Sequence, residues 1–404
     1  MPRTTPRLSA LLLGFPLLLS ACAAPAAEPQ RDETATPHGY VAGAQENPEP
    51  QTGLLTFNKE TGEGQLLSLL TGDTSDAGTS GPIGAAYQDG RYALLTTAGG
   101  VQVFDTGAWT VDHGEHKHYY SAAPGLVGTA AVPAAGAVAG DGEAIAVFST
   151  SGGYASVFRH KDLDAGNVQE SARITSTPHG GLVVPYEGHF LASVASAAVP
   201  AAAGGVEVRD TEDHTVLAAQ DCPGLSGHAT TRVGMVFACT DGALLVTEDD
   251  GAFAAEKIPY PDAGAGHPPA SGLAHRPGSN ELAGPAGEDG AWHLDVSRRT
   301  WTHLPTPVPV VAASAVGDGK RVLAAGADGS LLALNPATGE VGAQVPLLGA
   351  PAGDAVPQLR IDASRAYVSD PARRVVHEID YADGLRVART FEVPAADLML
   401  ETGL

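Results

Sequence analysis

Three of the chain's 14 histidines lie within six positions, in the string Asp112-His113-Gly114-Glu115-His116-Lys117-His118-Tyr119-Tyr120. Imidazole and carboxylate groups are ligands that zinc accepts. In an extended chain residues i and i+2 share a face, so His116 and His118 are expected to grip one ion together. A turn at Gly114 would fold a preceding side chain back as a third ligand. The alternative is a polar loop whose histidines occur by chance. The zinc ligands predicted in this segment are Asp112, His113, Glu115, His116 and His118.

Two further histidines occupy equivalent places in what prove to be repeats. Each falls just before an apolar strand, in Pro178-His179-Gly180-Gly181 and in Ser226-Gly227-His228-Ala229. If those strands line a central channel, the preceding loops surround one of its mouths. Adjacent repeats would then bring both imidazoles near that mouth, where zinc ligands distant in sequence could converge. The alternative is a pair of loop histidines that face water.

Two of the chain's three cysteines, Cys222 and Cys239, lie far from the N-terminus. Outside the cytoplasm, two thiols in one folded domain tend to pair. The loop between them is short, and the chain-entropy account assigns such a bridge about 3 kcal/mol of stabilisation. The sequence therefore predicts a Cys222–Cys239 disulfide, with two free buried thiols as the alternative.

A repeating pattern of strands and turns must position these residues. The pattern is clearest in 311–347, where four apolar strands are separated by turns such as Gly317-Asp318-Gly319 and Ala327-Asp328-Gly329. Alternation of this kind with such turns is typical of four-stranded antiparallel units. Related units recur at roughly 40–55 residues, the period of propeller blades. No amphipathic helix is evident, so the predicted fold class is all-β, a β-propeller.

Counting the units gives an expected number of blades. Seven begin near Ile83, Gly136, Gly181, Ala229, Gly272, Val311 and Gln358. Upstream, only three strands are expected, in 40–42, 54–57 and 65–69. The C-terminal segment 398–401 would supply the missing strand and close the ring, which removes exposed sheet edges. The prediction is eight blades, with seven as the fallback.

The N-terminus reads as a targeting segment rather than as part of the fold. Arg3 and Arg7 precede the apolar run 8–19, which is too short to span a bilayer comfortably. The run ends in Leu19-Ser20-Ala21-Cys22, which resembles the lipobox of bacterial lipoproteins. The predicted division is a signal peptide over 1–21, lipid attachment at Cys22, a flexible tether over 22–37, and a propeller domain over 38–404. We expect an extracytoplasmic protein that meets the membrane through its lipid anchor only.

Charge and motif content narrow the function. The formal net charge of −23 argues against a nucleic-acid partner and raises the local concentration of cations. The chain lacks a Gly-x-Ser-x-Gly elbow, a His-Glu-x-x-His motif and a P-loop. The sequence therefore favours a non-enzymatic binding protein.

Several of these features together resemble the AztD family of periplasmic zinc metallochaperones. The resemblance runs from about His38 to the end and rests on the propeller repeats, the 112–120 string, the two cysteine segments and the stretch 366–380. In that family a histidine lies closer to the Cys-Pro-Gly turn, where this chain has Leu225-Ser226 and offers His228 slightly later. The resemblance implies a Zn²⁺ carrier whose partner is the solute-binding protein of a zinc ABC importer.

Two rival functions remain open. One is a metal-free cell-surface propeller that binds protein through its rim. The other is a propeller hydrolase or lyase, in which a catalytic zinc would keep an open coordination position.

Overall fold

Antiparallel pairing between neighbouring strands dominates the structure, a computed structural model that describes residues 39–113, 116–261, 266–349 and 355–403. The predicted signal peptide, Cys22, the tether and Glu115 lie outside these residues. The described unit over 39–404 is nearly all β, with one short helix, α1 (His160–Asp164), and a 3-10 turn, η2 (Gly287–Asp289). Among the described residues, no helix is long and apolar enough to cross a membrane.

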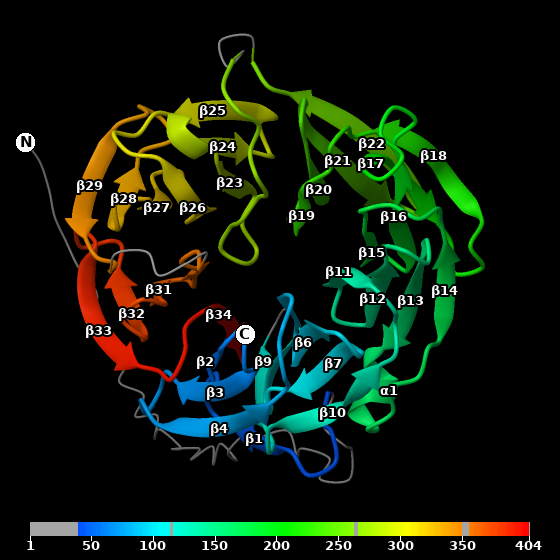
Figure 1. Ribbon diagram of the computed structural model, residues 1–404, viewed down its shortest axis with the longest axis horizontal. Helices are drawn as coiled ribbons and strands as arrows, with labels where there is room; N and C mark the ends of the chain where they lie inside the picture. Colours follow the sequence, from blue (N-terminus) through cyan, green and yellow to red (C-terminus); the bar gives the residue numbers. More distant parts are fainter. Residues whose placement is uncertain (1–38, 114–115, 262–265, 350–354, 404) are drawn as a thin grey trace, which may run out of the picture. The chain divides into compact units, whose positions relative to one another are not determined.

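Eight sheets of similar build follow one another around a common centre in the described part of the chain (Figure 1). We number them along the chain, each written from its innermost strand outward. Sheet 1 consists of β34 (Leu398–Thr402), β2 (Gly53–Phe57), β3 (Glu63–Ser68) and β4 (Thr74–Thr79). Sheet 2 consists of β5 (Ala86–Asp89), β6 (Tyr92–Thr97), β7 (Gly100–Asp105) and β10 (Gly125–Ala130). Sheet 3 consists of β11 (Ala135–Gly140), β12 (Ala144–Ser149), β13 (Tyr154–Arg159) and β14 (Ala172–Thr175).

The next three sheets continue the pattern. Sheet 4 consists of β15 (Val183–Tyr186), β16 (His189–Ala195), β17 (Ala203–Arg209) and β18 (Thr215–Asp221). Sheet 5 consists of β19 (Gly227–Thr230), β20 (Met235–Cys239), β21 (Gly242–Asp249) and β22 (Ala252–Pro259). Sheet 6 has three strands, β23 (Glu281–Pro285), β24 (Ala291–Asp295) and β25 (Thr300–Leu304). Its innermost place is taken by a single bridge between Ala274 and Ala283.

The last two sheets are again four-stranded. Sheet 7 consists of β26 (Val310–Ala315), β27 (Val322–Gly326), β28 (Ser330–Leu334) and β29 (Val341–Pro346). Sheet 8 consists of β30 (Leu359–Ile361), β31 (Ala366–Asp370), β32 (Val375–Asp380) and β33 (Arg386–Glu392). The turn between β27 and β28 shows why glycine recurs here. Gly329 has a φ of 85°, and a Cβ there would lie 2.8 Å from the carbonyl oxygen of Leu348.

Apolar faces of neighbouring sheets meet to form the core. One cluster joins sheets 4 and 5, another joins sheets 6 and 7, and a third joins sheets 7 and 8. Ala and Val supply many of the side chains in these clusters. Outermost strands such as β29 and β33 are largely exposed. The predicted disulfide is confirmed: Cys222 and Cys239 are buried and bonded within the cluster between sheets 4 and 5.

Of the strands predicted for sheet 1, the C-terminal strand is confirmed and the strand at 40–42 is not. The C-terminal strand β34 pairs antiparallel with β2, Leu55 opposite Leu400, as predicted. The strand predicted at 40–42 is wrong, because that segment turns, with Ala44 N donating to Val41 O. The fourth strand of sheet 1 is instead β4. Its sequence Thr-Ser-Asp-Ala-Gly-Thr has no apolar alternation, because an outer strand buries little.

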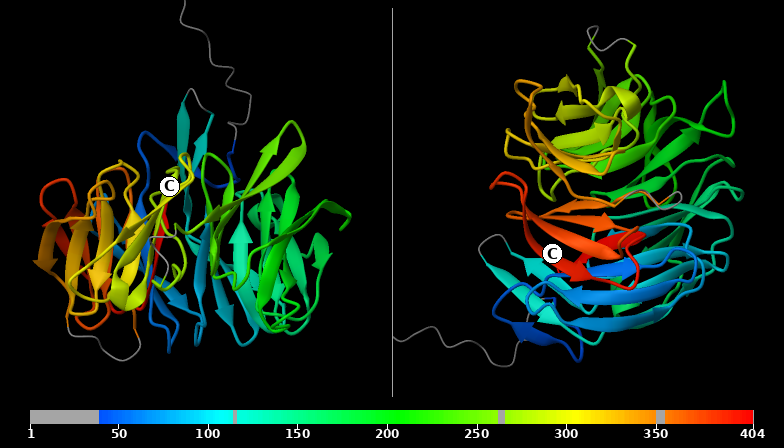
Figure 2. Two further views of the ribbon diagram at one scale, coloured as in Figure 1. Left: turned by 90° about the horizontal axis from the view of Figure 1, so that it is seen from above. Right: turned by 60° about the vertical axis from the view of Figure 1, so that its left-hand side comes forward.

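A ninth, smaller sheet departs from the repeat. Its order is β1 (Gln45–Asn47), β9 (Lys117–Ser121) and β8 (Ala108–Asp112). The hairpin of β8 and β9 is inserted between β7 and β10, and we call the three strands the hairpin sheet. Figure 2 shows the hairpin, in cyan, rising beyond the neighbouring sheets.

Candidate metal centre

Aromatic side chains fix the base of the hairpin sheet. The ring of Tyr120 is fully buried and stacks on Trp109 with 5.4 Å between centroids. Trp109 donates its indole N–H to Gly39 O at 3.1 Å, and the guanidinium of Arg91 lies 4.0 Å above its ring. The guanidinium over the indole face and the stacked ring of Tyr120 together hold Trp109 in place. The base of the hairpin below its tip is therefore well packed.

The three histidines of the string come together at that tip. The ring centroids of His116 and His118 lie 4.8 Å apart, and that of His113 lies 5.3 Å from the first and 5.2 Å from the second. The hairpin is closed by His113 N donating to His116 O at 3.0 Å. The i, i+2 spacing therefore places His116 and His118 together as predicted, and the turn returns His113 to them.

Sequence reasoning missed Glu46, which lies beside this cluster. Its Oε1 is 2.7 Å from Nδ1 of His118. Glu46 belongs to β1, where it faces Tyr120, two residues along β9 from His118. A carboxylate on the far nitrogen of an imidazole fixes the ring and its tautomer, as in many zinc sites. No motif links Glu46 to residues more than seventy positions away, so only the pairing of β1 with β9 reveals it.

Short contacts join the ring nitrogens of this cluster. Nε2 of His116 and Nε2 of His118 are 3.0 Å apart, so one of them donates to the other. The carboxylate of Glu46 accepts from Nδ1–H of His118, which in a neutral ring leaves Nε2 of His118 as the nitrogen with the lone pair. Two imidazole nitrogens on one tetrahedral zinc would be about 3.3 Å apart, given the usual Zn–N distance. A small rotation of the His116 ring would therefore replace the shared proton with an ion.

Asp112 lies across the hairpin from the lysine of the string. Its Oδ2 is 2.9 Å from Nζ of Lys117, and both side chains are about half exposed. In their present arrangement, no group of three or more His, Cys, Asp and Glu side chains among the described residues is set to hold a metal ion. The tip therefore brings three imidazoles together, two of them joined by a hydrogen bond.

His179 lies in a different environment. It is 3 % exposed and has partners for both ring nitrogens. Nδ1 donates to Thr177 O at 2.6 Å, and Nε2 accepts from the hydroxyl of Ser193 at 2.8 Å. The Ser193 oxygen in turn accepts from Leu182 N. His179 would have to release Ser193 before binding an ion, so its predicted ligand role stays a prediction.

His228 lies on β19, the innermost strand of sheet 5, and is partly accessible but closely surrounded by protein. This burial lowers the pKa of His228 to about 4. His275, near the innermost position of sheet 6, also has a lowered pKa because of burial, and its Nδ1 is 2.6 Å from Arg276 O. Neutral imidazoles of this kind are competent ligands, and the predicted role of His228 likewise stays a prediction.

The hairpin histidines and His179 lie at opposite ends of the strands. In an antiparallel four-stranded sheet the first and third strands run the same way. His179 precedes the first strand of sheet 4, whereas the hairpin follows β7, the third strand of sheet 2. The sequence treated both groups as candidates for zinc, and the topology separates them.

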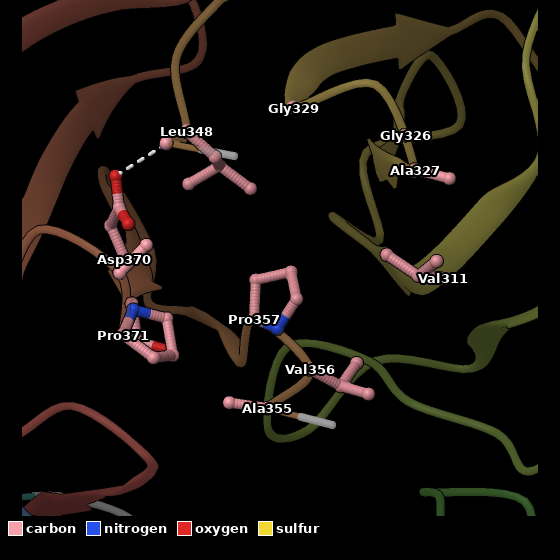
Figure 3. Close-up of a pocket in the computed structure, with 13 residues that line it drawn as sticks. Val311, Gly326, Ala327, Gly329, Leu348, Ala355, Val356, Pro357, Asp370 and Pro371 are labelled. Atoms are coloured by element: carbon pink, nitrogen blue, oxygen red, sulfur yellow. Dashed lines mark hydrogen bonds between the residues drawn. The ribbon is translucent and has the colours of Figure 1, made fainter. Parts of the chain in front are cut away.

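A cavity between sheets 7 and 8 differs from the histidine cluster in its chemistry. It measures about 340 Å³ and its walls are mainly apolar, from side chains such as Val311, Leu348 and Pro357 (Figure 3). Its one acidic residue, Asp370, is 2 % exposed and accepts from Gly349 N at 2.8 Å. Figure 3 shows that carboxylate turned toward the backbone beside Leu348. The cavity thus has the form of a small-molecule pocket and not of a metal site.

Comparison with solved structures identifies the fold. The crystal structure of Citrobacter koseri AztD matches with a TM-score of 0.77 at 20 % identity, over 88 % of this chain and 99 % of that one. Its apo structure matches with a TM-score of 0.78 at 20 % identity, over 88 % and 98 %. The chain has the AztD fold. Dihydro-heme d1 dehydrogenase NirN matches less well, with a TM-score of 0.56 at 12 % identity over 88 % and 76 %.

At the level of the fold, the similarity to AztD confirms the resemblance drawn from the sequence. No protein-family model matches the chain, and no curated protein matches it by sequence. The site must therefore be argued from its own residues.

Proposed function

We propose that the protein is an extracytoplasmic zinc metallochaperone with the hairpin tip as its zinc site. The observation that carries this proposal is the cluster of His113, His116 and His118, with Glu46 on the far nitrogen of His118. Imidazoles backed by a carboxylate are typical zinc ligands. The AztD fold and the acidic composition support the same function.

The cluster suits a carrier because the ion can be exchanged at an exposed tip. Zinc would replace the proton that His116 and His118 share, while Glu46 keeps His118 oriented. His113, Asp112 and Glu115 are the proposed further ligands, with Asp112 exchanging its ion pair with Lys117 for the ion. A partner can then replace these ligands one at a time, whereas the rigid sheets behind them stay fixed. No bond of a substrate is made or broken.

The proposed acceptor is the solute-binding protein of a zinc ABC importer. Direct transfer passes through a ternary intermediate in which both proteins hold the ion. The transfer rate should then rise with acceptor concentration. The experiment mixes zinc-loaded protein with apo acceptor, with and without excess of a slow chelator. Transfer that ignores acceptor concentration and is abolished by the chelator would leave only a passive zinc buffer.

Metal content separates this function from its rivals. Protein purified without a His-tag should carry or take up zinc stoichiometrically. A metal-free interaction module would take up none. A hydrolase or lyase would hold zinc but turn over a substrate at an open coordination position.

We also infer an eight-bladed propeller in which β34 closes sheet 1. The supporting observations are the eight successive sheets and the pairing of β34 with β2.

Lipid attachment at Cys22 places the proposed carrier at the membrane surface. Cys22→Ser should move the protein from the membrane fraction to the soluble fraction, because the thiol is the point of acylation. Fractionation followed by immunoblotting measures this, with Cys222→Ser as a control that keeps Cys22. Unchanged membrane association of the Cys22→Ser variant would refute the anchor.

A further inference from the structure

A buried histidine on β24 has a nitrogen without a hydrogen-bond partner in the described part of the chain. His293 is 6 % exposed, and within the described part of the chain its Nε2 makes no hydrogen bond. Its neighbours Trp292 and Leu294 pack toward sheet 5, so His293 points from the opposite side of the strand, toward sheet 7. A buried polar atom without a partner costs about 1–3 kcal/mol, so its presence calls for an explanation.

Two carboxylates share this side of sheet 6. Glu281 lies directly opposite Asp295 in the pairing of β23 with β24, and Asp295 is two residues from His293. Oε2 of Glu281 is 3.6 Å from Nε2 of His293, which is within ion-pair distance but too long for a hydrogen bond. The same oxygen accepts from Gly319 N at 3.2 Å, which fixes its position.

These three side chains line one hollow of about 260 Å³ between sheets 6 and 7. Arg298, Thr300 and Thr302 complete its polar wall. Glu281 and Asp295 are largely buried, with side-chain exposures of 15 % and 13 %. The C-terminal end of β24 and the turns after β26 and β28 border the hollow, and strand direction puts them at the same end of the sheets as the hairpin.

We propose that this hollow is a second site for a divalent transition-metal ion, with zinc as the preferred ion. His293 Nε2 and Glu281 Oε2 are its first two ligands. Their separation of 3.6 Å is close to the roughly 3.3 Å between two ligands of a tetrahedral zinc ion. One imidazole, carboxylate oxygens and water form a donor set that zinc accepts.

Asp295 is the proposed third ligand, and the guanidinium of Arg298 now occupies the position next to it that the ion would take. Its backbone N–H donates to Asp295 Oδ1 at 3.0 Å, and its guanidinium donates to Asp295 Oδ2 at 2.9 Å. The Arg298 side chain is 81 % exposed, so the ion pair is weak and easily exchanged. A bound ion would displace the guanidinium and take an oxygen of Asp295. Without Arg298, the hollow holds two carboxylates and no cation.

The site predicts opposite effects from neighbouring substitutions. The experiment titrates full-length protein carrying His113→Ala, His116→Ala and His118→Ala with ZnCl₂ against a chromophoric chelator. In this background, His293→Gln and Glu281→Gln should each lower the zinc affinity of the remaining site by at least about tenfold. Losing a residue that only hydrogen-bonds to a metal ligand already costs about that much, and a direct ligand should cost no less. Arg298→Ala should tighten it, because it removes the competing cation. The matched control is Arg299→Ala, which removes the next arginine without touching Asp295.

Cobalt substitution gives a second readout. The visible spectrum of the Co²⁺ form should report nitrogen and oxygen ligands in the triple variant and should vanish with His293→Gln. Thermal melting checks that His293→Gln and Glu281→Gln leave the fold intact. If either buried substitution unfolds the protein, the exposed substitution Arg298→Ala still tests the site.

Two results would overturn the second site. One is a triple variant without any stoichiometric zinc. The other is Arg298→Ala binding zinc no more tightly than Arg299→Ala, because the guanidinium of Arg298 would then not compete with an ion for Asp295. Neither result bears on the hairpin, whose loss is measured separately by comparing the triple variant with the parent.

Discussion

The sequence predicts zinc ligands both in the hairpin and at His179, and the structure places these imidazoles in different surroundings. At the tip, His116 and His118 are joined by a hydrogen bond, with His116 exposed and the side chain of His118 21 % exposed. His179 is enclosed, and backbone and hydroxyl groups satisfy both of its nitrogens. An ion can enter the first arrangement by displacing a proton, whereas the second must first lose an internal hydrogen bond. Clustering and access, rather than the number of histidines, decide which imidazoles could take up an ion without breaking internal hydrogen bonds.

The largest expected effect is on zinc affinity at the tip. Replacing His113, His116 and His118 together by Ala should weaken the tightest zinc binding by more than about 100-fold, since all imidazoles of the cluster are removed. Isothermal calorimetry or chelator competition measures it. His189→Ala with His214→Ala, two histidines outside the cluster, is the control. Parental affinity in the triple variant would remove the hairpin from the proposed function.

Glu46→Gln should have an intermediate effect, because it keeps the size of the side chain but loses the charge that orients His118. We expect zinc affinity to fall by about 10–100-fold, with the fold unchanged. The matched control is Glu49→Gln, a nearby exposed carboxylate. Equal affinities of the two variants would reduce Glu46 to a surface residue.

His179→Ala tests the enclosed side of the comparison. It should lower the free energy of unfolding by about 1–3 kcal/mol, because Ser193 and Thr177 lose their partner inside the protein. Urea unfolding measures this loss, and a zinc titration of the same variant tests the predicted ligand role of His179. A drop in zinc affinity without a drop in stability would instead make His179 a ligand.

The smallest expected effect is a pH dependence at His228. Its pKa is lowered from 6.5 to about 4, so the unfolded chain binds a proton at a higher pH than the folded protein does. Stability from this group is therefore present above about pH 6.5 and is lost as the pH falls toward 4. His228→Gln should lose less stability than the parent between pH 7 and pH 5 in urea unfolding. Identical losses would place His228 in a more hydrated setting.

The sequence by itself determined the class of fold and the local part of the site. Strand alternation and Gly-rich turns are local signals, and they predicted four-stranded units and the role of the C-terminal strand. The Cys222–Cys239 bridge followed from the tendency of two thiols in one exported domain to pair. The i, i+2 spacing of His116 and His118 is equally local, and extended backbone geometry alone places them together. The outer strand β4 escaped because an exposed strand needs no apolar pattern.

Only the tertiary structure decided which distant residues join the local ones. Glu46 meets His118 because β1 pairs with β9, and Glu281 meets His293 because β23 pairs with β24. Strand direction, which follows from position within a sheet, put His179 on the face opposite the hairpin. These outcomes depend on register and topology. Packing of whole sheets fixes both, and no short stretch of sequence encodes them.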